Sequence, residues 1–247
     1  MTTDSNSSIE ELAFAPTPIG EISLRRRRDP RILGVDILEL KLGDEFLMSS
    51  LFHASEDALA TRGLAPFVGQ AIDVVIGGLG LGYTAAAALA VPGLRSLVVV
   101  DYLAAVIDWH RRGVVPLGPQ LVADPRCRLV HADFFEVAQG EAAAFDPARP
   151  AQRYHAVLLD VDHSPRELLD PRSAAFYSTA GLTRLARQLL PQGVFALWSN
   201  DPPDDAFVAV LQTVFVRVAT EVIRFPNPYQ DHDASSTLYI AQRRLAG

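Results

Sequence analysis

From residue 71 onward, short apolar segments alternate with segments of helical spacing, and this alternation constrains the fold more than any other feature of the chain. Strands that are apolar on both faces are typical of a parallel sheet covered by helices on both sides. Because such crossovers are right-handed, we expect an α/β fold with a doubly wound, mostly parallel seven-stranded sheet. The expected strands lie at residues 72–77, 96–101, 127–133, 154–162, 194–200, 221–225 and 236–243.

The segment before residue 71 has a different pattern. Its apolar and polar side chains alternate, and Asp-Pro and Gly-Asp turn signals divide it. We therefore expect a small N-terminal antiparallel β appendage, followed by a helix over residues 55–63 with Ser55 as its N-cap. The predicted division is a disordered tail at residues 1–18, the appendage and helix at 19–66, and a Rossmann-like domain at 67–247.

Composition excludes several classes of protein. The net charge of −7 argues against nucleic-acid binding, which needs a basic surface. Cys127 is the only cysteine, so the chain has no internal disulfide and no multi-cysteine metal site. No apolar run reaches the roughly 18 residues of a membrane-spanning helix, and the acidic N-terminus lacks the apolar core of a secretory signal. We therefore expect a cytoplasmic protein without nucleic-acid or membrane partners.

A glycine cluster lies where the first strand of the expected sheet gives way to a helix. Residues 74–84 read VVIGGLGLGYT, and Gly78, Gly80 and Gly82 let the backbone turn tightly and approach a ligand closely. Acids follow the next two strands: Asp101 can bind ribose hydroxyls, and Asp133 can accept from an adenine amino group. Together these features predict an adenosine-type ligand; packing glycines with helix-capping acids are the alternative.

The spacing of the glycines separates two kinds of ligand. Dinucleotide-binding folds use GxGxxG with a pyrophosphate on the helix N-terminus, whereas this chain has GxGxG followed by Tyr83 and Thr84. That pattern resembles the class I S-adenosylmethionine-dependent transferases, whose cofactor has no phosphate. The resemblance implies S-adenosylmethionine or a related molecule as the ligand, and an antiparallel strand inserted at the edge of the sheet.

The fourth expected strand ends in an acidic segment, LLDVDHSP at residues 158–165. Asp160 and Asp162 alternate at the strand end, so both side chains can face the crevice, with His163 beside them. A carboxylate pair suits an amine substrate, because one group can hold the ammonium and the other can take its proton as general base. Asp160 is the first candidate for the catalytic base and Asp162 for the second acid; capping or cofactor binding is the alternative for Asp160.

Longer stretches of the chain resemble the spermidine synthase-like (polyamine aminopropyltransferase) superfamily. They are IGGLGLGYT, VVVD, LVHADFFE, YHAVLLDVDHSP and FYSTAGLTRLARQLLPQGVFALWS, within residues 35–220. The resemblance implies decarboxylated S-adenosylmethionine as the donor, aminopropyl transfer to a small amine in polyamine biosynthesis, and a homodimer. Residues 42–60 lie where the family has its acceptor segment, which implies acceptor contacts by Ser49 and His53.

Departures from the family's motifs leave other functions open. The family carries an aspartate for the amine of the donor where this chain has Gly80, and its Tyr-His-Glu corresponds to residues 48–50, Met-Ser-Ser. Its Asp-Ser-x-Asp-Pro motif is replaced by residues 160–165. One alternative is a methyltransferase that uses intact S-adenosylmethionine, which needs no acid at Gly80. The other is a non-catalytic nucleoside-binding homologue.

Further side chains are candidates for substrate contact. Trp198 ends the fifth expected strand on the ligand side, where it either walls the acceptor pocket or packs in the core. His163 is either a substrate contact or an exposed loop histidine. Three residues of the expected N-terminal helix region, His53, Glu56 and Asp57, lack the spacing of metal ligands, so we predict no metal site.

Overall fold

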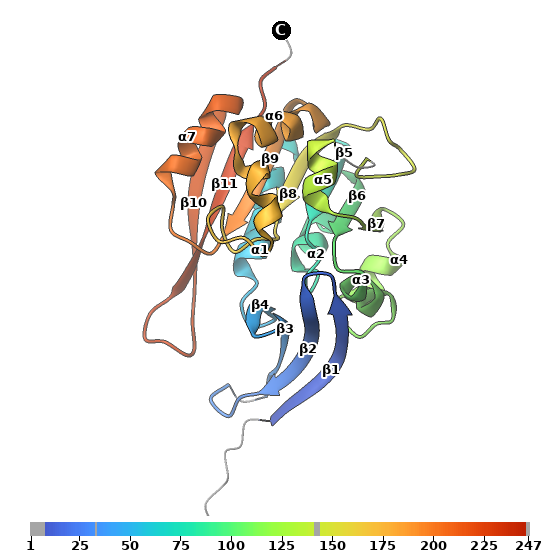
Figure 1. Ribbon diagram of the computed structural model, residues 1–247, viewed down its shortest axis with the longest axis vertical. Helices are drawn as coiled ribbons and strands as arrows, with labels where there is room; N and C mark the ends of the chain where they lie inside the picture. Colours follow the sequence, from blue (N-terminus) through green and yellow to red (C-terminus); the bar gives the residue numbers. More distant parts are fainter. Residues whose placement is uncertain (1–7, 33, 141–143, 246–247) are drawn as a thin grey trace, which may run out of the picture.

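The protein consists of two β-sheets, the larger of which is covered by helices, as a computed structural model shows for residues 8–32, 34–140 and 144–245 (Figure 1). In Figure 1 the smaller sheet, drawn in blue, lies below the larger one. It is antiparallel and has four strands: β1 (Ser8–Thr17), β2 (Gly20–Arg28), β3 (Asp36–Leu42) and β4 (Glu45–Ser49). The predicted N-terminal antiparallel appendage is confirmed.

The larger sheet has seven strands in the order β10-β11-β9-β8-β5-β6-β7. The pairs among β5 to β9 are parallel, whereas β11 runs antiparallel to both β9 and β10. This confirms the predicted doubly wound, mostly parallel sheet and its inserted antiparallel strand. The strands are β5 (Ile72–Gly77), β6 (Leu94–Asp101), β7 (Cys127–His131), β8 (Tyr154–Leu159), β9 (Leu189–Ser199), β10 (Arg217–Phe225) and β11 (Ala234–Gln242).

Helices cover both faces of the larger sheet because the side chains of each strand alternate between the faces. Val74 and Ile76 of β5 pack in one buried cluster, and Val75 packs in the other. The first cluster takes in α1 (Ala54–Leu64), α2 (Tyr83–Leu89), α3 (Ala104–Arg111) and α4 (Gly118–Ala123), and the second takes in α5 (Phe134–Gln139), α6 (Thr179–Gln188) and α7 (Asp205–Val214).

Among the described residues, no helix is long and apolar enough to cross a membrane.

Two features of the N-terminal region differ from the predicted division. β1 occupies residues 8–17, so the predicted disordered tail at residues 1–18 is wrong there; residues 1–7 lie outside the described residues. The helix α1, grouped above with the appendage, packs beside α2 and against β8, β9 and β11 of the larger sheet. The larger structural unit therefore begins with α1 rather than at residue 67.

Opposite charges on neighbouring strands explain why the N-terminal segment is ordered. Glu10 of β1 lies opposite Arg26 of β2, and their charged atoms are 3.6 Å apart. On the other side of β2, Arg27 forms an ion pair of 2.6 Å with Glu39 of β3. The exposed pair of Glu10 and Arg26 adds little stability by itself, whereas Arg27 and Glu39 are largely buried. The acidic N-terminal residues and the arginine run nevertheless become complementary once backbone pairing places them opposite each other.

A strained residue lies near the start of β9. Gln192 has a φ of 63°, the left-handed region, and no other non-glycine residue in the described ranges has a positive φ. This conformation costs roughly 1–2 kcal/mol for a residue with a Cβ. The Gln192 carbonyl accepts a hydrogen bond of 3.2 Å from the side chain of Gln242 on β11, which holds the turn in place. A glycine would adopt the same turn without the strain.

We expect Gln192→Gly to raise the free energy of unfolding by about 0.5–1 kcal/mol, because relief of the strain exceeds the added entropy of the unfolded chain. Urea unfolding followed by circular dichroism measures the change. Gln212→Gly on the exposed face of α7 is the matched control, and it should lower the free energy of unfolding by about 1 kcal/mol. Equal losses in the two variants would show that Gln192 carries no strain.

Candidate active site

A cavity of about 390 Å³ lies at the carboxyl ends of the parallel strands, where doubly wound folds bind their ligands. Residues that directly follow β5, β6, β7 and β8 line it, and Leu40 and Phe46 add lining from the smaller sheet. Its volume suits a small ligand. Two predicted site residues, Gly82 and His53, do not line it. The others do: Ser49, Gly78, Gly80, Asp101, Asp133, Asp160, Asp162, His163 and Trp198.

The turn after β5 needs glycine for different reasons at its three glycine positions. Gly78 has a φ of 92°, and a Cβ there would collide with the backbone carbonyl of Asp160. Gly80 has a φ of 49°, and the sulfur of Met48 occupies the space that its Cβ would take. Gly82, with a φ of 93°, instead meets side chains of α3 and α4. The structure therefore places Gly78 and Gly80 at the cavity and gives Gly82 a packing role.

Asp101 fixes this glycine turn to the end of β6. Its carboxylate accepts hydrogen bonds from the backbone N–H groups of Leu79 at 2.8 Å and Leu103 at 2.7 Å. Burial raises the pKa of Asp101, and these two donors oppose the rise. Since a carboxylate offers about four acceptor positions, Asp101 retains capacity for a ligand hydroxyl while it shapes the turn.

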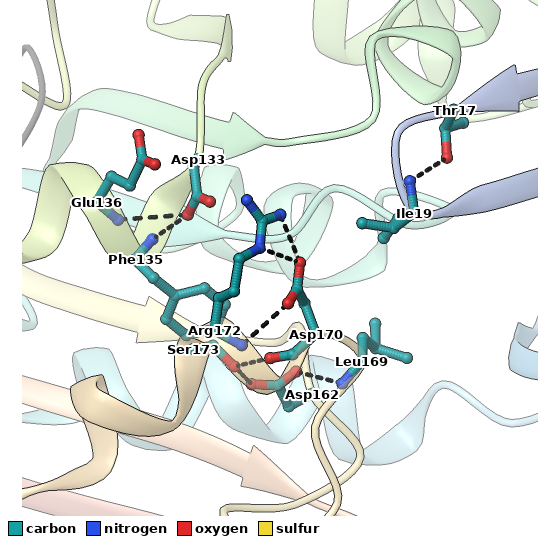
Figure 2. A network of polar contacts seen from close by, with 10 residues as sticks. All are labelled: Thr17, Ile19, Asp133, Phe135, Glu136, Asp162, Leu169, Asp170, Arg172 and Ser173. Carbon is teal, nitrogen blue, oxygen red and sulfur yellow. Dashed lines mark hydrogen bonds and ion pairs between the residues drawn. The ribbon is translucent and has the colours of Figure 1, made fainter.

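Asp133 caps a helix and also lines the cavity, so binding of an adenine amino group by its carboxylate stays a prediction. It is the N-cap of α5, where its Oδ1 accepts from the N–H groups of Phe135 at 2.8 Å and Glu136 at 3.3 Å (Figure 2). It also lines the cavity. Because Oδ1 makes both capping bonds, helix capping and ligand binding by Oδ2 are compatible.

Two carboxyl groups from different elements interact within the cavity. Asp160 directly follows β8, and Glu56 lies in the first turn of α1. Burial, and second the negative charge of Asp160, raise the pKa of Glu56 to about 8. Burial also raises the pKa of Asp160, to about 6, against the opposing hydrogen bond from Thr84. In both groups, burial therefore favours the protonated carboxyl over the carboxylate.

Hydrogen-bond donors from three elements orient this pair. The Thr84 hydroxyl on α2 donates to Oδ2 of Asp160 at 2.7 Å. The Ser55 hydroxyl donates to Oε2 of Glu56 at 2.7 Å, and the Trp198 indole N–H at the end of β9 donates to the Ser55 oxygen at 2.9 Å. Trp198 is therefore both a wall of the cavity and a link between the larger sheet and α1.

His53 and Ser55 differ from their predicted positions. His53, not Ser55, is the N-cap residue of α1, because the Ser55 hydroxyl is engaged by Glu56. The His53 ring stacks on Tyr83 with 4.1 Å between ring centres, and its Nδ1 lies 2.8 Å from Asp57. These contacts hold His53 outside the cavity, so the predicted contact between His53 and an acceptor is not supported.

Asp162 differs from Asp160 because its oxygens are engaged within the chain. They accept hydrogen bonds from the Leu169 N–H at 2.8 Å, the Ser173 hydroxyl at 3.2 Å and the Tyr177 hydroxyl at 2.7 Å. Figure 2 shows the first two of these contacts. Asp162 thereby ties the loop after β8 to the short helix η2 (Pro171–Tyr177). These contacts give Asp162 a structural role, and its predicted catalytic role stays a prediction; Glu56 is a second acid that lines the cavity with Asp160.

Two other predicted substrate contacts line the cavity with partners of their own. The His163 Nε2 lies 2.8 Å from Glu45 of β4, which joins the loop after β8 to the smaller sheet. Ser49 is buried, and its hydroxyl oxygen accepts from the Leu51 N–H at 3.0 Å. Contact of either residue with an acceptor stays a prediction.

Glu56 was not among the predicted catalytic residues, although the sequence of α1 singles it out. The helix buries a face with the spacing i, i+3, i+4, i+7 and i+8, and Glu56 is the first member of that face. An acid at such a position requires a partner or a function. The local sequence does not reveal that the end of β8 supplies that partner. The other members are Leu59, Ala60, Gly63 and Leu64.

This arrangement of strands and helices is also found in solved spermidine synthases. The spermidine synthase from Thermotoga maritima aligns with a TM-score of 0.70 at 16% identity, over 96% of this chain and 74% of that one. The chain has the fold of spermidine synthase. A spermidine synthase in complex with the transition state analogue AdoDATO gives a TM-score of 0.68 at 15% identity, over 96% of this chain and 73% of that one. No protein-family model and no curated protein matches the sequence.

We expect the wild-type protein to lose stability as the pH rises, and Glu56→Gln to retain that stability. A carboxyl group whose pKa is raised in the folded state stabilises the protein at low pH and destabilises it as the pH rises through that folded pKa. Between about pH 5 and about pH 8, the wild type should therefore lose on the order of 1–3 kcal/mol that Glu56→Gln retains.

Urea unfolding at several pH values measures this difference. The matched control is Glu136→Gln, at an exposed position of α5, which should follow the wild-type dependence. If Glu56→Gln also follows the wild-type dependence, the Glu56 carboxyl does not titrate as an acid buried beside Asp160.

Proposed function

We propose that the protein transfers an alkyl group, with aminopropyl as the first choice, from a decarboxylated S-adenosylmethionine-type donor to a small amine. The charge of the cavity lining carries this proposal. In the described part of the chain, no lysine or arginine lines the cavity. A lining of this sign attracts cations. Six acidic residues line it: Glu56, Asp101, Asp133, Asp160, Asp162 and Asp170.

The ligands of such a reaction fit this charge. A decarboxylated donor carries a sulfonium and an ammonium group and no carboxylate, and the acceptor is a further amine. The nucleoside of the donor would lie at Gly78 and Gly80, with Asp101 accepting from the ribose and Asp133 from the adenine amino group. The fold of spermidine synthase, one structure of which holds AdoDATO, supports this placement at the level of the fold.

Asp160 is the group best placed to handle the proton of the acceptor. An ammonium ion has no lone pair, so it must lose a proton before its nitrogen can attack. The donor supplies a carbon bonded to sulfonium, to which the nitrogen bonds as the carbon–sulfur bond breaks and its electron pair passes to sulfur. Asp160 takes the proton, and the Thr84 hydroxyl holds Oδ2 of Asp160 in place. Glu56 provides a second carboxyl group next to the charge that develops.

Methyl transfer from intact S-adenosylmethionine is the second candidate. It is favoured by Gly80, where the sulfur of Met48 fills the space next to the backbone and no acid is available for a donor ammonium. The acidic lining argues against it, because the carboxylate of the intact donor would meet acids rather than an arginine or lysine.

Calorimetric titration with the two donors separates these candidates. We expect decarboxylated S-adenosylmethionine to bind at least about tenfold more tightly than the intact donor, because only the intact donor brings a carboxylate to the acidic cavity. Preference for the intact donor would instead assign methyl transfer as the function of the protein. If neither donor, methylthioadenosine nor S-adenosylhomocysteine binds, the cavity is not a nucleoside site.

We expect Asp160→Asn to lower kcat by on the order of 100-fold or more, because the amide accepts the Thr84 hydrogen bond but cannot take a proton. Donor affinity should change little. Product release measured by chromatography, beside the same titration, gives both quantities. Asp57→Asn, in the first turn of α1, is the matched control and should retain activity, since Asp57 does not line the cavity. Full activity of Asp160→Asn would exclude Asp160 as the base.

A further inference from the structure

The strand order of the larger sheet determines the order of residues along the cavity. Asp133 and Asp101 follow β7 and β6 at one end of the sheet, and Asp160 follows β8 near its middle. Beyond β8 come β9, β11 and β10. A ligand that extends from the nucleoside end past Asp160 therefore reaches the cavity residues of these last three strands.

We call these residues the distal wall. It comprises Trp198 and Asn200 at the end of β9, Phe225 and Asn227 at the end of β10, and residues 234–236 at the start of β11. Within the described ranges, the cavity residues of the distal wall include no acid, lysine, arginine or histidine. The acids of the cavity lie from β7 to the loop after β8 and on α1, where Glu56 is joined to Trp198 of the distal wall through Ser55.

Aromatic side chains form much of the surface at this end. Phe52, which precedes α1, also lines the cavity, and its ring lies 5.8 Å from that of Phe225 and 6.4 Å from that of Tyr229. Phe46 of β4 lines the cavity and is itself 47% exposed, so apolar surface is available to a ligand there. Trp198 has its N–H engaged by Ser55 and offers only its ring to the cavity.

We infer that the acceptor is a monoamine with an apolar or aromatic body rather than a diamine; this rests on the proposed transfer to an amine. Glu56 and Asp160 accommodate one ammonium group. A second ammonium at the far end of the acceptor would lie against the distal wall, where no carboxylate compensates its lost hydration and aromatic faces compensate only part of it. An apolar tail gains from burial at the same place.

A comparison of two monoamine acceptors with a diamine tests this directly. With the wild-type protein and either donor, 1-pentylamine and 2-phenylethylamine should show a kcat/KM at least roughly 100-fold above that of 1,4-diaminobutane, because one molecule places a methyl group or ring where the other places a charge. Release of methylthioadenosine or S-adenosylhomocysteine, with the product mass, gives the rate and the group transferred.

A single isosteric substitution in the protein should alter its preference for monoamine over diamine acceptors. Asn227→Asp places a carboxylate on the distal wall, and Asp can keep the turn in which the Asn227 side chain accepts from the Tyr229 N–H at 3.0 Å. The ratio of diamine to monoamine kcat/KM should rise about tenfold. Gln230→Glu adds the same charge to the same hairpin at an exposed position outside the cavity, and its ratio should stay at the wild-type value.

The outcomes separate this inference from the proposed function. Preference for the diamine by the wild type, or equal ratios in Asn227→Asp and Gln230→Glu, would overturn the monoamine inference and leave the transferase proposal standing. Donor binding without reaction of any of the three amines would also overturn it. Absence of nucleoside binding in the titration would defeat the proposed function, and the acceptor inference with it.

Discussion

The architecture around the cavity depends on the burial of two carboxyl groups, Glu56 and Asp160, in one space. Burying one acid is costly, and burying a second beside it raises the cost further. The structure offsets this cost with hydrogen-bond donors from Thr84, Ser55 and, through Ser55, Trp198. These donors belong to α2, α1 and β9, so the position of α1 on the larger sheet is itself part of the site. Burial also raises the pKa of both groups, which lowers the cost by favouring their protonated forms.

The remaining acids of the cavity serve mainly to hold loops in place. Asp101 holds the glycine turn to β6, and Asp162 ties the loop after β8 to η2. At the far end, the ring of Tyr229 lies under the guanidinium groups of Arg31 and Arg27, 4.5 Å and 5.4 Å from its centre. The tip of the β10–β11 hairpin is thus attached to the N-terminal region. The cavity is lined by acids from its β7 end to the loop after β8, and its distal wall has no acid.

Periodicity was sufficient to predict the larger sheet, because strands buried on both faces and helices with one buried face leave different patterns in the sequence. The N-terminal strand was missed, because the local sequence does not show that Arg26 lies opposite Glu10 and so provides a partner for its charge. The same limit applies to the acids. Asp160 and Asp162 look equivalent in sequence, and the donors that engage Asp162 come from Ser173 and Tyr177, 11 and 15 residues further on. Such long-range partners decide which of two neighbouring acids stays available to a ligand.

The glycine turn shows how the two sheets determine the site together. The sulfur of Met48, from β4, lies against Gly80 and accepts from the Leu81 N–H at 3.1 Å. Gly80 also has a left-handed φ, which disfavours any residue with a Cβ. A side chain at Gly80 would meet the sulfur of Met48, so the Met48 side chain would have to move to accommodate it. The glycine turn at the cavity and the smaller sheet are coupled through this contact.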